Sequence, residues 1–328
     1  MNSESFPAIP TRQPIASLQL TAQQFLGLCS VPPETEWFAN LTSAQTRRAY
    51  QADLRAFLSF TGIVQPVELR CVTRAHVLAW RVELERQVLS AATIRRKLAA
   101  LSSLFDYLCE RHALNNNPAK GIKRPKVNCH EGKTPALSDT QARQLLEAPP
   151  SNTLKGRRDR AILSILLFHA LRREELSKLR VKDFNQMRSG VGHLLVQGKG
   201  KKIRFIPIHP GSFQLVSDYL DTAGHGHDLE GPLFRRIRSH SSDQTATALS
   251  PGSIYADVVT RYMSQTGMSG ENMGPHALRV TAATCALQNN TDIARVQLWL
   301  GHASIGTTKM YDRRGSRPED SPTYRVNY

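Results

Sequence analysis

Apolar residues recur at helical spacing through the first half of the chain. The clearest stripe has apolar side chains at intervals of four, three, four and three residues: Ile94, Leu98, Leu101, Phe105 and Leu108. This period puts them on one face of a helix, which Ser90 can cap. Shorter stripes follow Thr42 or Ser43 and Thr73, which can cap two more helices. The pattern predicts a helical domain over residues 36–127.

Basic side chains lie beside these apolar stripes rather than within them. Arg47 and Arg48 stand off the first stripe, and Arg95, Arg96 and Lys97 stand off the third. We therefore expect these five side chains on the outer surface of the helices, where they could meet a polyanion.

Two segments lack helical periodicity. Residues 1–35 contain five prolines and predict a flexible arm. Apolar residues are sparse again before Pro135, and we place an interdomain linker at residues 128–135. Lys123 and Arg124 lie just ahead of it, where they could follow DNA phosphates without reading sequence.

The second half mixes buried helices with one hairpin and predicts a domain over residues 136–315. The run from residue 161 to 170 is apolar nearly all round, as in a buried helix, and its His169 is expected to be a packed core residue. Two strands, at 191–196 and 203–208, flank a lysine-rich turn. We expect residues 225–250 to form a surface loop, and a helix to follow it.

The C-terminal stretch combines cationic residues with a tyrosine. His276 and Arg279 are three apart, so both project from one helical face, and Pro275 suits the first turn of that helix. The helix should break near residues 289–290, with Thr291 or Asp292 capping the next one and Gly301 ending it. Thr307 can then cap a short helix that presents Tyr311. This arrangement suggests phosphoryl transfer with a tyrosine nucleophile.

Composition narrows the class of partner. Lys and Arg number 43 against 27 Asp and Glu, a net charge of +16. With no apolar run long enough to span a membrane, this excess favours a nucleic acid. Five scattered cysteines argue against a disulfide framework and against a zinc ribbon. The N-terminus lacks the pattern of a signal peptide, so we expect a cytoplasmic protein.

Taken in order, four motifs resemble those of the tyrosine site-specific recombinases, the phage integrase family. They are Ala170-Leu-Arg172-Arg-Glu-Glu175-Leu, the turn Gly198-Lys199-Gly200, His276-Ala-Leu-Arg279, and Leu300-Gly-His302 followed by Tyr311. Alanine stands at position 170, where the family more often has glycine. The resemblance spans about residues 36–315. It implies a mainly α (α+β) protein, with an N-terminal helical core-binding domain and a C-terminal mixed helical catalytic domain that holds a small antiparallel β-sheet.

The resemblance also implies an enzyme that cuts and rejoins DNA strands through a 3′-phosphotyrosine intermediate, without metal, ATP or other cofactor. It implies six catalytic positions: Arg172, Lys199, His276, Arg279, His302 and Tyr311 as the nucleophile. Two guanidiniums would stabilise the phosphate. His276 is a candidate base or a phosphate partner, and Lys199 is the candidate acid for the 5′ oxygen. Lys201 and Lys202 are alternatives, expected to contact phosphates instead. Glu175 is expected to orient Arg172.

The implied partners are double-stranded DNA and further recombinase subunits, as a homo-tetramer or with a related recombinase on paired sites, with accessory DNA-bending proteins. No membrane is expected. The tail, residues 316–328, could add a strand to a sheet of its own or a neighbouring subunit; its Tyr324 and Tyr328 are rival nucleophiles by type alone. A type IB topoisomerase would use the same chemistry, and a DNA-binding module without catalysis would not need all six positions.

Overall fold

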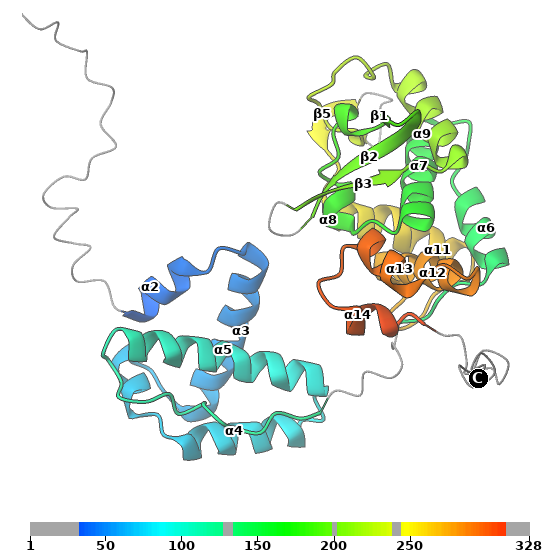
Figure 1. Ribbon diagram of the computed structural model, residues 1–328. Helices are drawn as coiled ribbons and strands as arrows, with labels where there is room; N and C mark the ends of the chain where they lie inside the picture. The colour runs from blue at the N-terminus through cyan, green and yellow to red at the C-terminus, as the bar shows by residue number, and fades with distance from the viewer. Residues whose placement is uncertain (1–32, 127–133, 199–201, 238–243, 313–328) are drawn as a thin grey trace, which may run out of the picture. The chain divides into compact units, whose positions relative to one another are not determined.

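The computed structural model describes residues 33–126, 134–198, 202–237 and 244–312 (Figure 1). The chain forms two compact units, Met1–Val127 and Asn128–Tyr328. The predicted arm and linker fall mostly outside the described residues. Helix α2 begins at Pro33, within the segment expected to be the arm. No described helix is both long and apolar enough to cross a bilayer.

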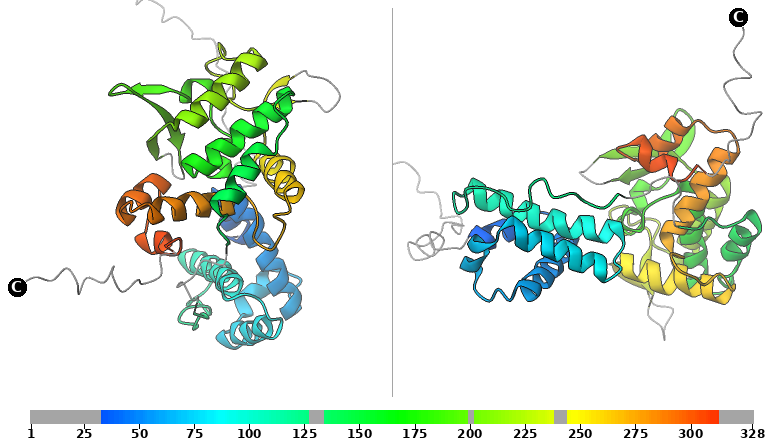
Figure 2. Two further views of the ribbon diagram at one scale, coloured as in Figure 1. Left: turned by 90° about the vertical axis from the view of Figure 1, so that its right-hand side faces the viewer. Right: turned by 90° about the horizontal axis from the view of Figure 1, so that it is seen from below.

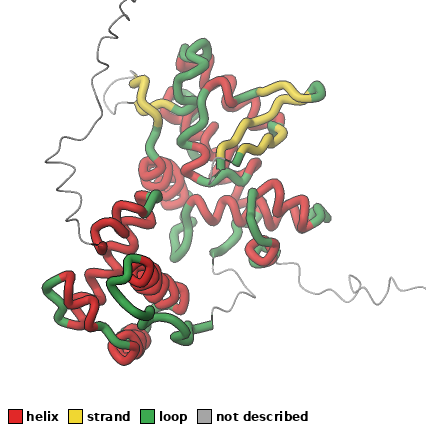
Figure 3. Tube along the Cα trace, turned by 60° about the vertical axis from the view of Figure 1, so that its left-hand side comes forward, coloured by secondary structure: helices red, strands yellow, loops and turns green. Residues whose placement is uncertain are grey.

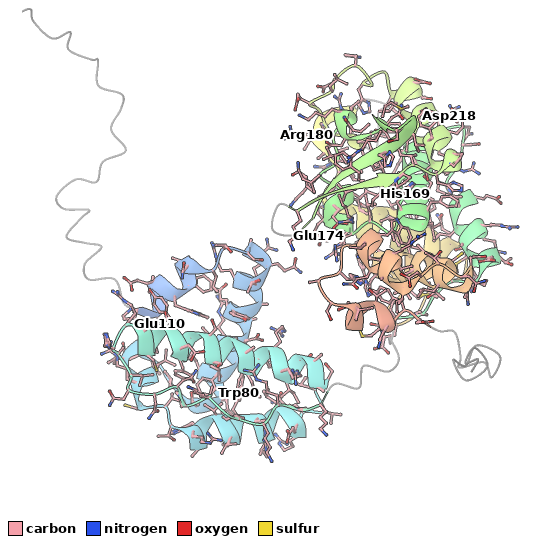
Figure 4. The ribbon with its side chains drawn as sticks, in the orientation of Figure 1. Trp80, Glu110, His169, Glu174, Arg180 and Asp218 are labelled. Carbon is pink, nitrogen blue, oxygen red and sulfur yellow. The ribbon has the colours of Figure 1, made fainter. Side chains whose placement is uncertain are left out.

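The first unit is helical, as predicted. Its elements are α2 (Pro33–Asn40), α3 (Ala44–Thr61), the 3₁₀ helix η1 (Pro66–Cys71), α4 (Arg74–Arg86) and α5 (Ala91–Glu110). Ser43 and Ser90 cap α3 and α5 through their side chains, and Thr73 is the N-cap of α4. The predicted stripe on α5 is buried in the core of this unit. That core includes Trp80 (labelled in Figure 4), which packs edge-on against Phe57 at 5.1 Å between ring centroids.

The expected outward position of Lys97 is wrong. Its side chain is 14% exposed, and its Nζ lies 3.4 Å from Oδ1 of Asp53 and 5.8 Å from the centre of the Trp80 ring. Asp53 belongs to α3, which packs against α5, and its carboxylate is buried. A buried carboxylate requires compensating cations, so Asp53 draws in Lys97 and also pairs with Arg96.

The other predicted DNA-contact residues of this unit differ in their exposure to solvent and in their hydrogen bonds within the protein. Arg47 is half-buried and donates to the Leu41 carbonyl oxygen. Arg95 is exposed and donates to the Pro125 carbonyl oxygen at 3.3 Å. Arg48, Lys123 and Arg124 are exposed. Their contact with DNA remains a prediction.

The second unit contains most of the described secondary structure. Its helices are α6 (Asp139–Glu147), α7 (Leu154–His169), α8 (Arg173–Leu176), η2 (Val181–Asp183), α9 (Pro210–Ala223), α10 (Pro251–Ser253), the π-helix η4 (Ile254–Thr260), α11 (Arg261–Gln265), α12 (Pro275–Gln288), α13 (Ile293–Leu300) and α14 (Ile305–Lys309). Figure 3 shows that every described strand belongs to this unit. The structure is therefore mainly α with small antiparallel sheets, as the sequence predicts.

A three-stranded antiparallel sheet runs in the order β1 (Gln186–Arg188), β2 (Val191–Gln197) and β3 (Ile203–Pro207). The predicted hairpin is confirmed as β2–β3, with Val196 opposite Arg204. Strand β1 was not predicted. A second sheet pairs β4 (Arg235–Ile237) with β5 (Gln244–Ala248), so the expectation of a plain surface loop over residues 225–250 is wrong. Strands β1 and β4, of three residues each, are too short to show the period-two alternation by which strands are predicted.

Helix α7 lies at the centre of the second unit. It is buried on nearly all sides, as predicted, and belongs to the same core as residues of α9, α12 and the sheet. His169 at its C-terminus is 1% exposed (labelled in Figure 4) and accepts a hydrogen bond from the His209 backbone N–H at 3.0 Å through Nε2. His169 is therefore the packed core residue that was expected.

Helices α12, α13 and α14 follow one another closely (orange to red in Figure 2). The predicted break separates α12 from α13, Asp292 caps α13, and Gly301 ends α13 in the left-handed conformation at φ +65°. The N-cap of α14 is Ser304, not Thr307. Helices α12 and α13 and Tyr311 form a small apolar cluster with Ala170, which brings Tyr311 against the end of α7.

Candidate active site

The end of α7 and the start of α8 position Arg172. Ala170 turns the chain with a left-handed φ of +51°, and Arg172 is the N-cap of α8. Its guanidinium donates to Oε1 of Glu175 at 2.8 Å and to the Gly301 carbonyl oxygen at 3.4 Å. Glu175 also accepts from the Arg172 backbone N–H at 2.9 Å. The carboxylate therefore holds both the backbone and the side chain of Arg172.

Sequence reasoning missed Arg204, which donates to the same carboxylate from β3. Its Nη1 lies 3.0 Å from Oε1 of Glu175 and its Nη2 lies 2.7 Å from Oε2. The sequence shows only an arginine within the predicted strand 203–208; that its side chain is half-buried, and so needs a counter-ion, is known from the structure. The partner, 29 residues earlier, is not visible without the fold.

The first turns of α12 carry His276 and Arg279. Arg279 is 2% exposed and donates to the carbonyl oxygens of Ala170 and Leu300. His276 Nε2 lies 3.5 Å from the Tyr311 hydroxyl oxygen. The spacing of three residues places both side chains on one face of α12, as predicted, and the structure brings His276 beside Tyr311.

His302 and Tyr311 complete this group from the last part of the described chain. The His302 Nδ1 lies 2.9 Å from the Thr308 hydroxyl, and its ring centre is 5.5 Å from that of Tyr311. Tyr311 is 4% exposed, and its backbone carbonyl oxygen accepts a hydrogen bond from the Thr284 hydroxyl at 3.1 Å. The tyrosine is therefore packed into the site instead of being presented to solvent.

These side chains line one cavity of about 710 Å³ in the second unit. Five of the six predicted catalytic residues are among its lining: Arg172, His276, Arg279, His302 and Tyr311. Lys199 and Lys201 lie outside the described residues. Lys202 is exposed where the hairpin closes, with its carbonyl oxygen accepting from the Gly198 N–H. In the described part of the chain, no cluster of His, Cys, Asp and Glu could hold a metal ion.

The cavity is electrostatically positive. Burial, followed by the charge of Arg172, lowers the pKa of Arg279 to about 10, which leaves it protonated at neutral pH. Burial and then Arg279 and Arg172 lower the pKa of His302 to about 4 and hold the pKa of His276 below its ordinary value. Burial raises the pKa of Tyr311 although Arg279 and Arg172 oppose it. At neutral pH the pocket therefore offers two cations, two neutral imidazoles and a protonated phenol.

Comparison with known proteins identifies the family. The model of the phage integrase family matches residues 135–316, and that of the phage integrase N-terminal SAM-like domain matches residues 37–112. Tyrosine recombinase XerC of Pelobacter propionicus is 32% identical over 272 residues, covering 82% of this chain and 84% of that protein. The chain belongs to the phage integrase family. It is therefore a tyrosine recombinase, an enzyme of site-specific recombination that cuts and rejoins DNA strands.

Other members extend the likeness. Tyrosine recombinase XerD of Shewanella oneidensis is 31% identical, covering 84% of this recombinase and 88% of that protein. The XerH site-specific recombinase in a post-cleavage complex with its difH substrate matches with a TM-score of 0.64 at 22% identity, covering 85% of this chain and 80% of that one. A lambda integrase dimer bound to a COC′ core site matches with a TM-score of 0.63 at 17% identity, covering 91% and 79%. These structures share the fold of this recombinase.

Proposed function

We propose that Tyr311 is the nucleophile of strand cleavage and that Arg172, Lys199, His276, Arg279 and His302 are its catalytic partners. One observation carries this proposal. Side chains from the end of α7, from α12 and from the segment after α13 line a single cavity, with the Tyr311 hydroxyl oxygen 3.5 Å from His276 Nε2. A purely structural tyrosine would need no such ring of cations and imidazoles.

The proposed reaction is a phosphoryl transfer from DNA to the enzyme. The Tyr311 oxygen attacks phosphorus, the bond from phosphorus to the 5′ oxygen breaks, and a 3′-phosphotyrosine and a free 5′ hydroxyl result. Neutral His276, next to the phenol, takes the tyrosine proton, and Lys199 gives a proton to the leaving 5′ oxygen. Arg172 and Arg279 stabilise the charge that builds on the non-bridging oxygens. Attack by another 5′ hydroxyl reverses the step and joins the strands.

We further infer that the enzyme acts on duplex DNA as four subunits on paired sites, assisted by DNA-bending proteins. Support comes from a lambda integrase tetramer bound to a Holliday junction, which matches this chain with a TM-score of 0.62 at 17% identity. The exposed Arg48, Lys123 and Arg124, with the net charge of +16, suit the contacts to DNA phosphates that such binding requires.

A nicked suicide substrate tests the nucleophile, because loss of the short 5′ fragment traps the covalent adduct. We expect Tyr311→Phe to reduce adduct formation by more than about 1,000-fold while DNA binding in a gel-shift assay is retained. Tyr255→Phe is the matched control, since Tyr255 lines the same cavity and is the rival nucleophile in space. The proposal fails if Tyr311→Phe still forms the adduct or if Tyr255→Phe abolishes it.

A further inference from the structure

The Arg204 guanidinium forms a paired contact with a buried carboxylate at the edge of the active site. Both of its terminal nitrogens donate to Glu175, one to each carboxylate oxygen, at 3.0 and 2.7 Å. The Arg204 side chain is 16% exposed and the Glu175 side chain is 4% exposed. A two-point ion pair shielded from water fixes the orientation of both groups.

The same guanidinium packs against two glycines. A Cβ atom added at Gly301 would lie 3.1 Å from Nη1 of Arg204, and one added at Gly198 would lie 3.3 Å from it. Gly198 immediately precedes Lys199, and Gly301 immediately precedes His302. Arg204 therefore contacts the chain beside two predicted catalytic residues and, through Glu175, a third.

The net charge of Arg172, Glu175 and Arg204 indicates what the contact between Arg204 and Glu175 does. Arg172 and Glu175 alone would form a neutral pair, and the carboxylate would compete with a DNA phosphate for the Arg172 guanidinium. With Arg204 added, two cations share one anion, and the group keeps a net positive charge. Arg204 occupies both carboxylate oxygens, whereas the Arg172 side chain donates to Oε1 through Nη1. The Nη2 of Arg172 is directed instead to the Gly301 carbonyl oxygen at 3.4 Å.

We propose that Arg204 is a positioning residue for strand cleavage, which fixes Glu175 and the Gly301 backbone and thereby holds Arg172 ready for the scissile phosphate. Arg204 does not line the cavity among the described residues, so it acts through these neighbours. The inference rests on the proposed function of the Arg172 and Tyr311 site.

Substitution of Arg204→Gln removes the charge and the paired donors at similar length. We expect single-turnover cleavage of the nicked substrate to slow by about 100-fold, as for other misplaced catalytic groups, while the DNA dissociation constant stays within about threefold. Arg188→Gln is the matched control. Arg188 belongs to the same sheet, but its guanidinium stacks on the Phe205 ring at 3.8 Å, so cleavage should remain at the wild-type rate.

A pH profile separates positioning from a general loss of stability. The charged groups that face Glu175 are Arg172 from its own turn, Arg204 from β3 and Arg279 from α12. Burial raises the pKa of Glu175, but the hydrogen bonds from Arg204 and Arg172 outweigh it and keep that pKa below its ordinary value. In Arg204→Gln, Glu175 should protonate as pH falls, and the cleavage rate should fall more steeply on the acid side than in wild type. A merely structural defect would lower the rate equally at every pH.

The results separate a failure of this inference from a failure of the proposed function. If Arg204→Gln cleaves within about threefold of wild type while Tyr311→Phe is inactive, the inference fails and the proposed function stands; if Tyr311→Phe forms the adduct, the proposed function fails first. A rate loss in Arg204→Gln with an unchanged pH profile also overturns the inference. If Arg204→Gln does not fold, Arg204→Lys takes its place. Lysine keeps the positive charge but not the two planar donors of the guanidinium. We therefore expect Arg204→Lys to cleave about tenfold more slowly, with a steeper fall in rate on the acid side of the pH profile. A folded Arg204→Lys enzyme with the wild-type rate and pH profile would refute the positioning role.

Discussion

Arg279 connects two separate segments of the active site through its own hydrogen bonds. Its guanidinium donates to the carbonyl oxygen of Ala170, two residues before Arg172, and to that of Leu300, two residues before His302. A lysine could not span both carbonyls and still meet a phosphate, because its ammonium lacks the planar fork. One buried side chain thus sets the spacing between the elements that carry the other cations.

His302 makes the stability of the protein depend on pH. Burial, followed by the charges of Arg279 and Arg172, lowers its pKa to about 4, whereas an unfolded histidine titrates near 6.5. Between these values the unfolded chain binds a proton that the folded chain excludes, so stability falls as pH falls. We expect urea unfolding to show a loss of stability from pH 7 to pH 5 in wild type, and a smaller loss in His302→Gln.

The control for this pH dependence is His227→Gln, at an exposed position that does not line the cavity. It should lose as much stability between the two pH values as wild type does. Equal losses in wild type and His302→Gln would show that the imidazole is not kept neutral by its surroundings.

At the scale of elements, sequence predicts best what is decided locally. Ser90 and Ser43, one of the two residues expected to cap the first helix, are N-caps, because an N-cap bonds a backbone N–H only three residues ahead. The pairing of Arg204 with Glu175 and the burial of Lys97 beside Asp53 depend on elements 29 and 44 residues apart in the sequence. The sequence motifs located the catalytic candidates and Glu175, which was expected to orient Arg172, whereas Arg204 became visible only in the fold.

The two C-terminal glycine caps of α9 and α13 allow a matched test of the contact with Arg204. Gly224 and Gly301 both end a helix in the left-handed region, at φ +66° and +65°. A Cβ at Gly224 would meet nothing within 4 Å, whereas one at Gly301 would lie 3.1 Å from the Arg204 guanidinium. Each alanine substitution should cost about 1 kcal/mol of stability from backbone strain, measured by chemical unfolding.

Only Gly301→Ala should slow cleavage as well, by about tenfold or more, because only there must Arg204 move. Gly224→Ala should cleave the nicked substrate at the wild-type rate. A Gly301→Ala enzyme with full activity would mean that Arg204 can shift without disturbing Arg172.

At the scale of the whole molecule, the total of 43 lysines and arginines overstates how many cations are available to DNA. Asp53 occupies Lys97 and Arg96, Glu175 occupies Arg204, and Glu230 pairs with Arg180 and Lys182. A cation already paired within the protein releases no counter-ion from DNA unless its internal partner is given up. Affinity for DNA should therefore depend on exposed arginines and lysines that have no internal partner, not on the total.

Arg48 and Lys97 allow a test of the difference between an exposed cation and one that is paired inside the protein. Arg48 is exposed on α3, whereas Lys97 is largely buried against Asp53 and the Trp80 ring. Each phosphate contact contributes about 0.9 to the slope of log K against log salt, so Arg48→Gln should reduce that slope by about this amount without changing the unfolding midpoint.

Lys97→Gln leaves a buried carboxylate short of a partner and should lower the free energy of unfolding by about 1–3 kcal/mol, with the salt slope unchanged. DNA titrations at several salt concentrations and chemical unfolding measure the two quantities. The reverse result, a changed slope for Lys97→Gln, would mean that binding draws this lysine out of the core toward DNA.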